Sequence, residues 1–455
     1  MKNINVREMI DETKFNRYHG MVLFWCAFAI FSEGYDLVIL GSAIPVLIEE
    51  WGITSNQAGM LGSATIIGMM LGAFFFGTLA DRIGRKNIII FCVAIFSFFT
   101  FIIGFTNNIY QFGMFRFIAG IGLGGVMPNA IALMSEYAPR NLKSTLISVM
   151  FSGYSVGGIV AALIAILLIP KYGWEVTFFI GGIPLLLLPF MYKTLPESPY
   201  ILIARQQNKE LASILVKLKT KYVPSDGERF STGFPEQEVG NAVAELFKKG
   251  RAFSTVMLWL AFSMCLLMIF GMNTWLPELM NAAGYPLTSS ILFLLVLNFG
   301  AIFGAIGGGW LSDKWNPKKV LVLFFIIAAI SISFLGFKAN ILLLYVLVAI
   351  AGASTVGTQI IANAYTSQYY PSKIRSSGVG WALGVGRLGA IAGPLVGGVL
   401  LTLALPTYQN FLAFAIPAVI GAIAIFFVKE KQSGSEIGYQ GIPEMAKKQQ
   451  PGSNM

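Results

Sequence analysis

The stretch GTLADRIGRK, residues 77–86, occurs a second time in this chain as the related stretch GWLSDKWNPKK, residues 309–319. Their leading glycines, Gly77 and Gly309, are 232 residues apart. Each copy follows an apolar segment long enough to cross a bilayer, and each ends in basic residues, as a short turn at an anionic membrane surface would. A repeat at matching places indicates two related halves of one membrane protein.

The composition indicates that most of the chain is surrounded by lipid. Hydrophobic residues make up 56% of the 455 residues and charged residues only 12%, about half the charge of a soluble domain. Apolar segments of spanning length must be helices, because hydrocarbon offers no water to satisfy their backbone polar groups. We place twelve such segments at 20–48, 57–80, 87–106, 110–135, 144–169, 174–193, 253–277, 287–312, 319–337, 341–368, 376–404 and 407–428.

A long polar segment divides these helices into six plus six. Residues 195–252 carry most of the loop charge and form the predicted cytoplasmic linker. The linker joins an N-terminal six-helix bundle, residues 1–194, to a C-terminal six-helix bundle, residues 253–430. Residues 431–455 form a cytoplasmic tail that we expect to be disordered. The predicted fold class is an all-α membrane protein of two pseudo-symmetric bundles.

The basic residues predict the orientation. With the N-terminus in the cytoplasm, 28 of the 32 Lys and Arg residues lie on the cytoplasmic side, all but Lys171, Lys338, Arg116 and Arg387. This asymmetry follows the positive-inside rule. It also accounts for the net charge of +10 without a nucleic-acid partner. We therefore expect a monomeric multi-pass protein of the cell membrane, with both termini in the cytoplasm and the lipid bilayer as its surroundings.

Four charged residues stand out within the predicted spans, where a charge is costly and by default marks a functional site. Glu33 and Asp36 are three residues apart and share one face of the first helix. Asp36 and Arg116 lie at similar depths, so we expect them to pair. Arg387 lies in the other half. Static salt bridges are the alternative interpretation, but they would not place the acids in one half and an unmatched cation in the other.

This division of charge is typical of a carrier. A carboxylate in a low-dielectric cavity can carry a proton, so Asp36, Glu33 and Arg116 are candidates for proton coupling. The planar guanidinium of Arg387 matches a carboxylate and is a candidate for binding an anionic substrate. The neutral candidates for substrate contact, each of which could instead make an interhelical hydrogen bond, are Gln359, Asn363, Asn273, Trp275, Asn298 and Tyr154.

The repeated loop is a candidate for conformational change. Its glycines would let two helices approach, and its aspartates can pair with Arg or face a helix N-terminus. The candidates here are Gly77, Asp81, Arg82, Gly84, Arg85, Gly309 and Asp313. In this loop the chain resembles the major facilitator superfamily, whose hallmark is the same motif in both halves, although the second copy lacks the Gly-Arg of the first.

The first helix makes the resemblance more specific. EGYDLVILG, residues 33–41, resembles the acidic-Gly-aromatic-Asp motif of aromatic acid:proton symporters, which usually have Asp where this chain has Glu33. The resemblance extends over nearly all of the chain before residue 430. It implies proton-coupled uptake of benzoate-like or hydroxybenzoate-like anions by alternating access.

Two further segments resemble the same family. Residues 116–158 resemble its helix 4 to helix 5 segment, which implies functional positions at Arg116 and, for proton coupling, at Glu136. Residues 369–394 resemble its helix 10 to helix 11 segment, which implies functional basic positions at Arg375 and Arg387.

Other functions remain as alternatives. The same carrier could take another organic anion, such as nicotinate or a dicarboxylate, whereas a neutral sugar would leave Arg387 as a buried cation without a ligand. An enzyme is disfavoured because the sole histidine, His19, lies at the membrane edge, so neither a His metal cluster nor a Ser-His-Asp triad can form. We expect no cofactor and no metal. Three intramembrane cysteines, Cys26, Cys92 and Cys265, are expected to be free thiols.

Overall fold

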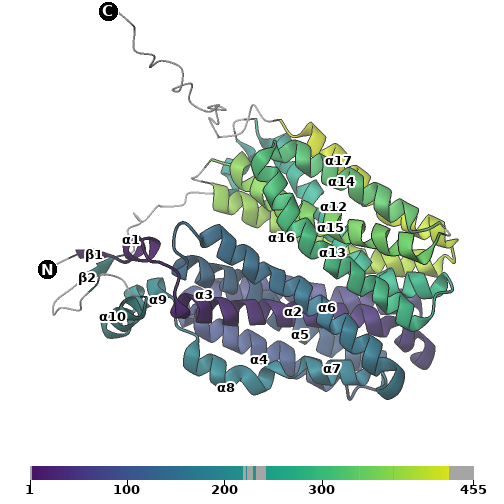
Figure 1. Ribbon diagram of the computed structural model, residues 1–455, viewed down its shortest axis with the longest axis horizontal. Coiled ribbons are helices and arrows are strands. Elements are labelled where there is room, and N and C mark those ends of the chain that lie inside the picture. The colour runs from purple at the N-terminus through teal and green to yellow at the C-terminus, as the bar shows by residue number, and fades with distance from the viewer. Residues whose placement is uncertain are drawn as a thin grey trace, which may run out of the picture.

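Figure 1 shows a computed structural model of the chain in which two groups of helices lie against each other. The structure describes residues 3–218, 222, 229–231, 242–248, 250–337, 339–371 and 374–429, apart from the side chains of Asn3, Asp81, Ser144, Arg229, Ala242, Asp313 and Ser376. Within these residues, twelve helical segments are long and apolar enough to cross a membrane. The predicted spans are therefore confirmed to within a few residues. The predicted tail, residues 431–455, lies outside the described residues.

The N-terminal group consists of the first six spans. α2 packs on α6, α3 on α5, and α4 on α5, while the two short helices α7 and α8 cover α4. The helices are α2 (Arg17–Trp51), α3 (Ser55–Ile83), α4 (Arg85–Ile103), α5 (Ile109–Tyr137), α6 (Lys143–Tyr172), α7 (Glu175–Gly181) and α8 (Pro184–Thr194).

The C-terminal group repeats this arrangement. α12 packs on α16, α13 on α15, and α14 on both α15 and α17, so each pairing has a counterpart in the first group. The predicted pseudo-symmetry is confirmed. The helices are α12 (Ala252–Ala282), α13 (Leu287–Lys314), α14 (Pro317–Phe334), α15 (Ile341–Tyr369), α16 (Arg375–Thr402) and α17 (Thr407–Phe427).

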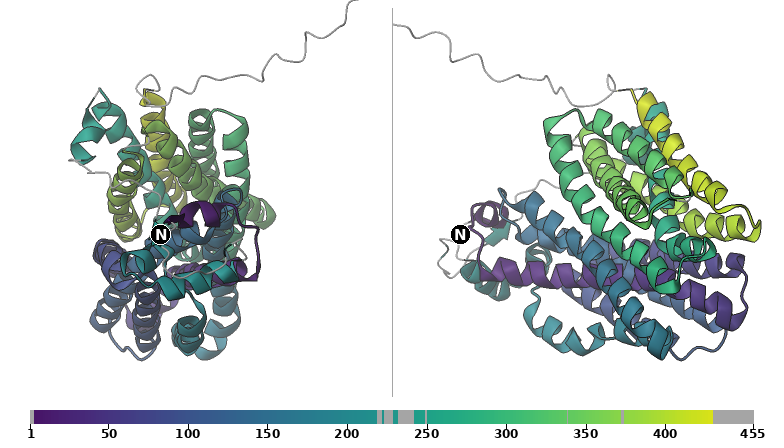
Figure 2. Two further views of the ribbon diagram at one scale, coloured as in Figure 1. Left: turned by 90° about the vertical axis from the view of Figure 1, so that its left-hand side faces the viewer. Right: turned by 45° about the vertical axis from the view of Figure 1, so that its right-hand side comes forward.

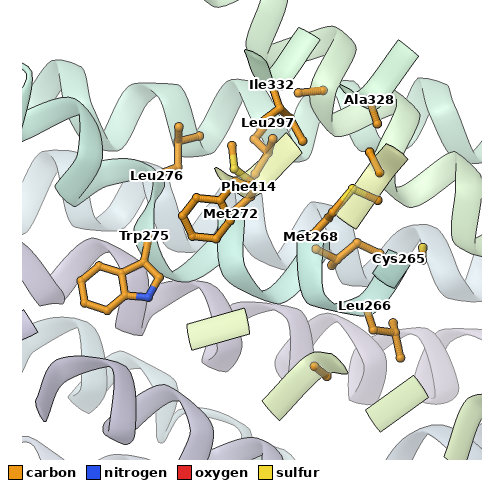
Figure 3. Packing of buried hydrophobic residues seen from close by; sticks show 14 of the residues in the cluster. Cys265, Leu266, Met268, Met272, Trp275, Leu276, Leu297, Ala328, Ile332 and Phe414 are labelled. Carbon is orange, nitrogen blue, oxygen red and sulfur yellow. The ribbon is translucent and has the colours of Figure 1, made fainter. Parts of the chain in front are cut away.

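The C-terminal group has a dry core. Figure 3 shows Met272 of α12 and Phe414 of α17 close together, with Leu297 of α13 beside them. Burial of a side chain of this size contributes roughly 1.5–3 kcal/mol where the alternative is water. In a bilayer the close contact itself is what favours association, because lipid is as apolar as the core.

Local chemistry explains where the spans begin and break. Thr54 and Gln57 form a reciprocal capping box at the start of α3, which satisfies backbone donors that have no partner within the helix. The sixth span, predicted as one helix, is interrupted at residues 182–183 between α7 and α8. Pro184 has no N–H to continue the helical ladder, and Gly181 and Gly182 are poor helix formers.

The N-terminal segment and the linker between the bundles gather at one end, which we call the linker face. β1 (Asn3–Asn5) pairs in parallel with β2 (Arg229–Ser231), and α1 (Val6–Asp11), α9 (Pro199–Ala204) and α10 (Asn208–Lys217) lie beside this small sheet (Figure 1). α11 (Ala242–Phe247) packs instead on α12 and α16. The sequence did not predict the sheet, because three-residue strands leave no periodic pattern.

The two bundles are in close contact at the end away from the linker face. The clearest contact joins α3 to α16, where the hydroxyl of Ser63 donates to the carbonyl of Ile391 at 2.8 Å. Gly59 lies so close to the Pro394 carbonyl that a Cβ at Gly59 would clash with it. Glycine is required at such a position because only its backbone permits this approach.

The same two helices separate toward the linker face. A Cβ built on Gly77 of α3, or on Gly380 or Gly384 of α16, would meet no atom within 4 Å. Figure 2 shows the corresponding divergence of the two bundles. The structure is therefore closed at one end and open at the linker face.

The close helix approach predicted at Gly77 and Gly309 is absent from this conformation. A Cβ at either position would meet no atom within 4 Å. The prediction was wrong for this state because both glycines lie at the linker-face ends of their helices, where the bundles have moved apart.

Candidate functional site

The carboxylate of Asp36 is at the centre of a buried ion pair. Arg116 Nη1 lies 2.8 Å from Asp36 Oδ2, and Thr100 donates a hydrogen bond to Oδ1 of the same carboxylate. Asp36 and Arg116 are each only 1% exposed. The expected pairing is confirmed, and helices α2, α4 and α5 are joined by it. Arg116 Nη1 also donates to the Asp36 main-chain carbonyl at 3.3 Å, which adds a second contact between α5 and α2.

Glu33 is one turn from Asp36, but its surroundings differ. It is 1% exposed, and neither carboxylate oxygen has a hydrogen-bond partner among the described residues. The groups that interact electrostatically with it include Arg387, which belongs to the other bundle. A buried carboxylate without hydrogen bonds is costly to keep charged. Of Glu33 and Asp36, Glu33 is therefore the acid whose charge is less compensated by its own bundle.

Arg387 reaches the interface between the bundles from α16. Its guanidinium interacts electrostatically with Glu33 of α2 and with Tyr154 of α6, and its Nη1 lies 3.9 Å from Met69 Sδ of α3. The thioether is a weak acceptor, so this contact leaves most of the donors of the guanidinium available. The predicted cation and one predicted acid are thus within electrostatic range of each other across the interface.

Close backbone packing holds Glu33 against Tyr154. A Cβ at Gly34 would overlap the Tyr154 carbonyl, so α2 and α6 meet without an intervening side chain. The Tyr154 ring is partly buried. The close approach of the two backbones at Gly34 places Tyr154 at this junction.

The neutral candidates lie in two places. Asn298 donates to Asn273 at 3.2 Å, joining α13 to α12 where both helices face the N-terminal bundle; a Cβ on Gly158 of α6 would clash with the Asn298 amide oxygen. Gln359 and Asn363 lie one turn apart on α15, both partly buried. The amide oxygen of Asn363 has no hydrogen-bond partner among the described residues.

Trp275 is part of the packing between α12 and α16. Its ring is fully buried, and its indole N–H donates to the Pro394 carbonyl at 2.8 Å. The indole is thus fully engaged within the bundle (Figure 3). We therefore leave Trp275 out of the site proposed below.

Glu136 lies in a different cluster from Asp36. Its carboxylate forms an ion pair with Arg85, whose Nε lies 2.8 Å from Oε1, and accepts a hydrogen bond from the hydroxyl of Ser198. Twenty residues separate Glu136 from Arg116 on α5, or about 30 Å along the helix. The structure therefore places Glu136 with the repeated loop and not with the proposed proton-coupling acids.

The loop after α3 is tied to the start of α9. Oε1 of Glu197 accepts from the backbone N–H groups of Lys86 at 3.1 Å and Ser198 at 2.8 Å, and Arg205 donates to the Arg82 carbonyl at 2.6 Å. These contacts join the linker to the N-terminal bundle. The side chains of Asp81 and Asp313 lie outside the described part of the chain, and Arg375 is exposed at the start of α16.

Gly84 has a backbone that resists substitution. Its φ is +102°, and a Cβ there would clash with the Glu197 carboxylate. We expect Gly84→Ala to lower the free energy of unfolding by about 1–3 kcal/mol, because both the strained backbone and the clash oppose an added methyl group. Thermal unfolding of the purified protein in detergent measures the change.

Gly77→Ala is the matched control, since it adds the same methyl group to the same motif in open space. Alanine favours a helix over glycine, so this control should be at least as stable as the unmodified protein. Equal destabilisation by both substitutions would contradict the assignment to Gly84.

Three contributors to these clusters were not found from the sequence. Thr100 and Ser198 are ordinary residues of an apolar helix and a loop, and only the fold places their hydroxyls on buried carboxylates. Met69 is one of 18 methionines. The sequence signal that could have identified Ser198 is its position in PESP, residues 196–199, directly after the sixth span.

With this geometry established, comparison with known proteins places the chain in a family. It matches the Major Facilitator Superfamily over residues 26–331 and 289–450, and it belongs to that superfamily. Two solved structures show the same fold. One is a bacterial homologue of the human lysosomal transporter Spinster, in an inward-facing and unoccupied conformation, with a TM-score of 0.72, 19% identity, and coverage of 92% of this chain and 98% of that one. The other is the inward-open xylose transporter XylE from E. coli, with a TM-score of 0.69, 16% identity, and coverage of 93% and 98%.

Several relatives are much more similar in sequence. The benzoate transport protein of Acinetobacter baylyi is 43% identical over 95% of this chain and 94% of its own length. The gallate transporter of Pseudomonas putida is 34% identical over 93% of this chain and 94% of its own length. The 4-hydroxybenzoate transporter PcaK of Pseudomonas putida is also 34% identical, over 93% and 95%.

Proposed function

We propose that this protein imports a small aromatic carboxylate, benzoate or a hydroxybenzoate, together with protons across the cell membrane. The observation that carries the proposal is that the buried Glu33 of one bundle and Arg387 of the other lie within electrostatic range of each other across the interface. A mobile anion and a fixed acid can then compete for one guanidinium. The sequence relatives named above support an aromatic carboxylate as that anion.

The transport cycle follows from this competition. With the linker face in the cytoplasm, as the basic residues predict, the conformation described here is open to the inside. Protonation neutralises Glu33 and leaves Arg387 free for the substrate carboxylate. When the substrate and the proton leave, Glu33 regains its charge and again faces Arg387. The bundles can then change conformation without an unpaired buried charge, whose cost would otherwise oppose the movement.

Asp36 has a different role from Glu33 in this proposal. Its charge is matched by Arg116 within one bundle, so it needs no exchange with the substrate. We assign it to holding α2 at α5, which keeps Glu33 at the interface. Gln359, Asn363, Asn273, Asn298 and Tyr154 complete the proposed binding site around the ring of the substrate.

Vesicle uptake tests the function. Purified protein in liposomes should accumulate labelled benzoate when the outside is more acidic, by roughly tenfold per pH unit if one proton moves with each anion. Unlabelled 4-hydroxybenzoate or gallate should compete. The proposed substrate class would be wrong if nicotinate or a dicarboxylate were taken up and benzoate were not.

The fork of Arg387 gives a direct test of substrate binding. Arg387→Lys keeps the charge but loses the two parallel N–H donors, so we expect the half-saturation concentration for benzoate to rise about tenfold or more. Arg140→Lys, at an exposed position on the linker face, is the control and should leave it unchanged. An unaltered half-saturation concentration in the Arg387 variant would argue against carboxylate binding there.

A further inference from the structure

A hydrophobic groove lies on the surface of the C-terminal bundle, between α14 and α17. Its volume is about 610 Å³, and its lining comes entirely from Val, Ile, Ala and Phe side chains of these two helices. Ile330 and Ile423 are each about half exposed, and Phe426 is 67% exposed. The groove is thus a depression in the surface that faces the membrane, separate from the transport site between the bundles.

Two exposed lysines lie at the linker-face ends of the helices that form the groove. Lys319 lies seven and eleven residues before Ile326 and Ile330, so all three share one face of α14. Lys429 follows Phe426 by three residues, just beyond the end of α17. Both lysines are exposed, and the Lys429 ammonium lies 5.9 Å from the ring of Phe253 at the start of α12.

The helix ends that carry these lysines are held together. Lys318 Nζ donates to the Val428 carbonyl at 2.7 Å, which ties the beginning of α14 to the end of α17. Lys319 and Lys429 are the immediate neighbours of these two residues. The separation of the two exposed ammonium groups is therefore limited by a contact that does not involve either of them.

We propose that this groove is a binding site for one anionic phospholipid. An acyl chain lies along the apolar groove, and the headgroup phosphate is bound by Lys319 and Lys429. Basic residues at the cytoplasmic end of a lipid-facing pocket attract anionic headgroups, each lysine adding to the preference. The two lysines match the anionic headgroup of such a lipid, and the apolar groove beyond them matches its acyl chain.

The same charges disfavour a second copy of this chain as the occupant. In a two-fold dimer within a membrane, equivalent surfaces face each other at the same depth. Dimerisation through this groove would place the lysine pairs of both copies side by side, and like charges repel. An anionic phospholipid headgroup would instead be attracted by the two lysines.

Lipid retention by the purified full-length protein tests the site. The protein is exchanged into detergent with equal amounts of dioleoyl phosphatidylglycerol and dioleoyl phosphatidylcholine, and bound lipid is counted by native mass spectrometry. We expect phosphatidylglycerol to be retained roughly tenfold over phosphatidylcholine. The double substitution Lys319→Gln and Lys429→Gln should bring the ratio close to one.

The control substitutions are Lys193→Gln and Lys209→Gln, which remove two exposed lysines from the linker side of the N-terminal bundle and should keep the preference. Ala422→Trp should fill the groove and reduce retention of both lipids. Since the lysine variants alter only exposed side chains, they test the site even if the tryptophan variant does not fold.

Four results would overturn the proposal. The first is equal retention of the two lipids by the unmodified protein, and the second is an equal loss of preference in the control variant. The third is that inorganic phosphate raises the thermal unfolding temperature of the protein as much as phosphatidylglycerol does. The fourth is disulfide cross-linking between copies carrying Ile423→Cys. The third would assign the lysines to free phosphate, and the fourth would assign the groove to a second copy. None of these results depends on the transported substrate.

Discussion

Liposomes containing the Glu33→Gln protein are expected to exchange benzoate across the membrane but to accumulate none of it against a gradient. Glutamine has nearly the same shape as glutamate and cannot take up a proton. Arg387 would then be available to the substrate in every state, so binding and exchange continue while the pH gradient no longer drives transport. Counterflow of labelled benzoate and uptake under an imposed pH gradient, measured on the same liposomes, separate the two activities.

Glu49→Gln is the matched control, because it makes the same chemical change on the same helix at an exposed position. It should leave both activities intact. Undiminished uphill uptake by the Glu33→Gln protein would exclude Glu33 as the proton carrier and would return that role to Asp36.

Asp36→Asn is expected to have the largest effect on stability. It removes the negative partner of Arg116 and leaves a guanidinium that is 1% exposed without a counter-charge. Breaking a buried pair from one side costs about 3–5 kcal/mol. We therefore expect a free energy of unfolding lower by about this amount, measured by denaturant titration of the purified protein in mild detergent.

The double substitution Asp36→Asn and Arg116→Gln tests whether the two charges stabilise the protein as a pair. It removes both charges and should recover most of the stability lost by the single substitution, because no uncompensated charge remains. A single variant as stable as the unmodified protein would show that the pair does not hold α2 to α5. Loss of accumulation in a well-folded double variant would instead give Asp36 a part in coupling.

The sequence predicted the architecture because the bilayer leaves few choices. Spanning length and the need for internal backbone hydrogen bonds define each helix, and the repeat at Gly77 and Gly309 predicted two related halves. The Asp36–Arg116 pair was also predictable, because depth along a helix is a matter of counting residues. The break before Pro184 also follows from local chemistry, because Gly181, Gly182 and Pro184 oppose a continuous helix.

Other features depend on contacts that no local pattern encodes. Sequence placed Glu136 among the proton-coupling candidates, but its neighbours Arg85 and Ser198 come from a loop and a linker whose fold could not be read in advance. Likewise, Glu33 and Asp36 look equivalent in sequence. Only the positions of Thr100, Arg116 and Arg387 give the two acids different surroundings.

The uneven spacing of α3 and α16 has a consequence for engineering. Gly77, Gly380 and Gly384 now border free volume, so bulky side chains there cost little in the present conformation. In a conformation in which these helix ends come together, the bulky side chains would collide with the neighbouring helix. Tryptophan at any of the three would therefore bias the population toward the present shape, giving a locked form suited to raising conformation-selective antibodies.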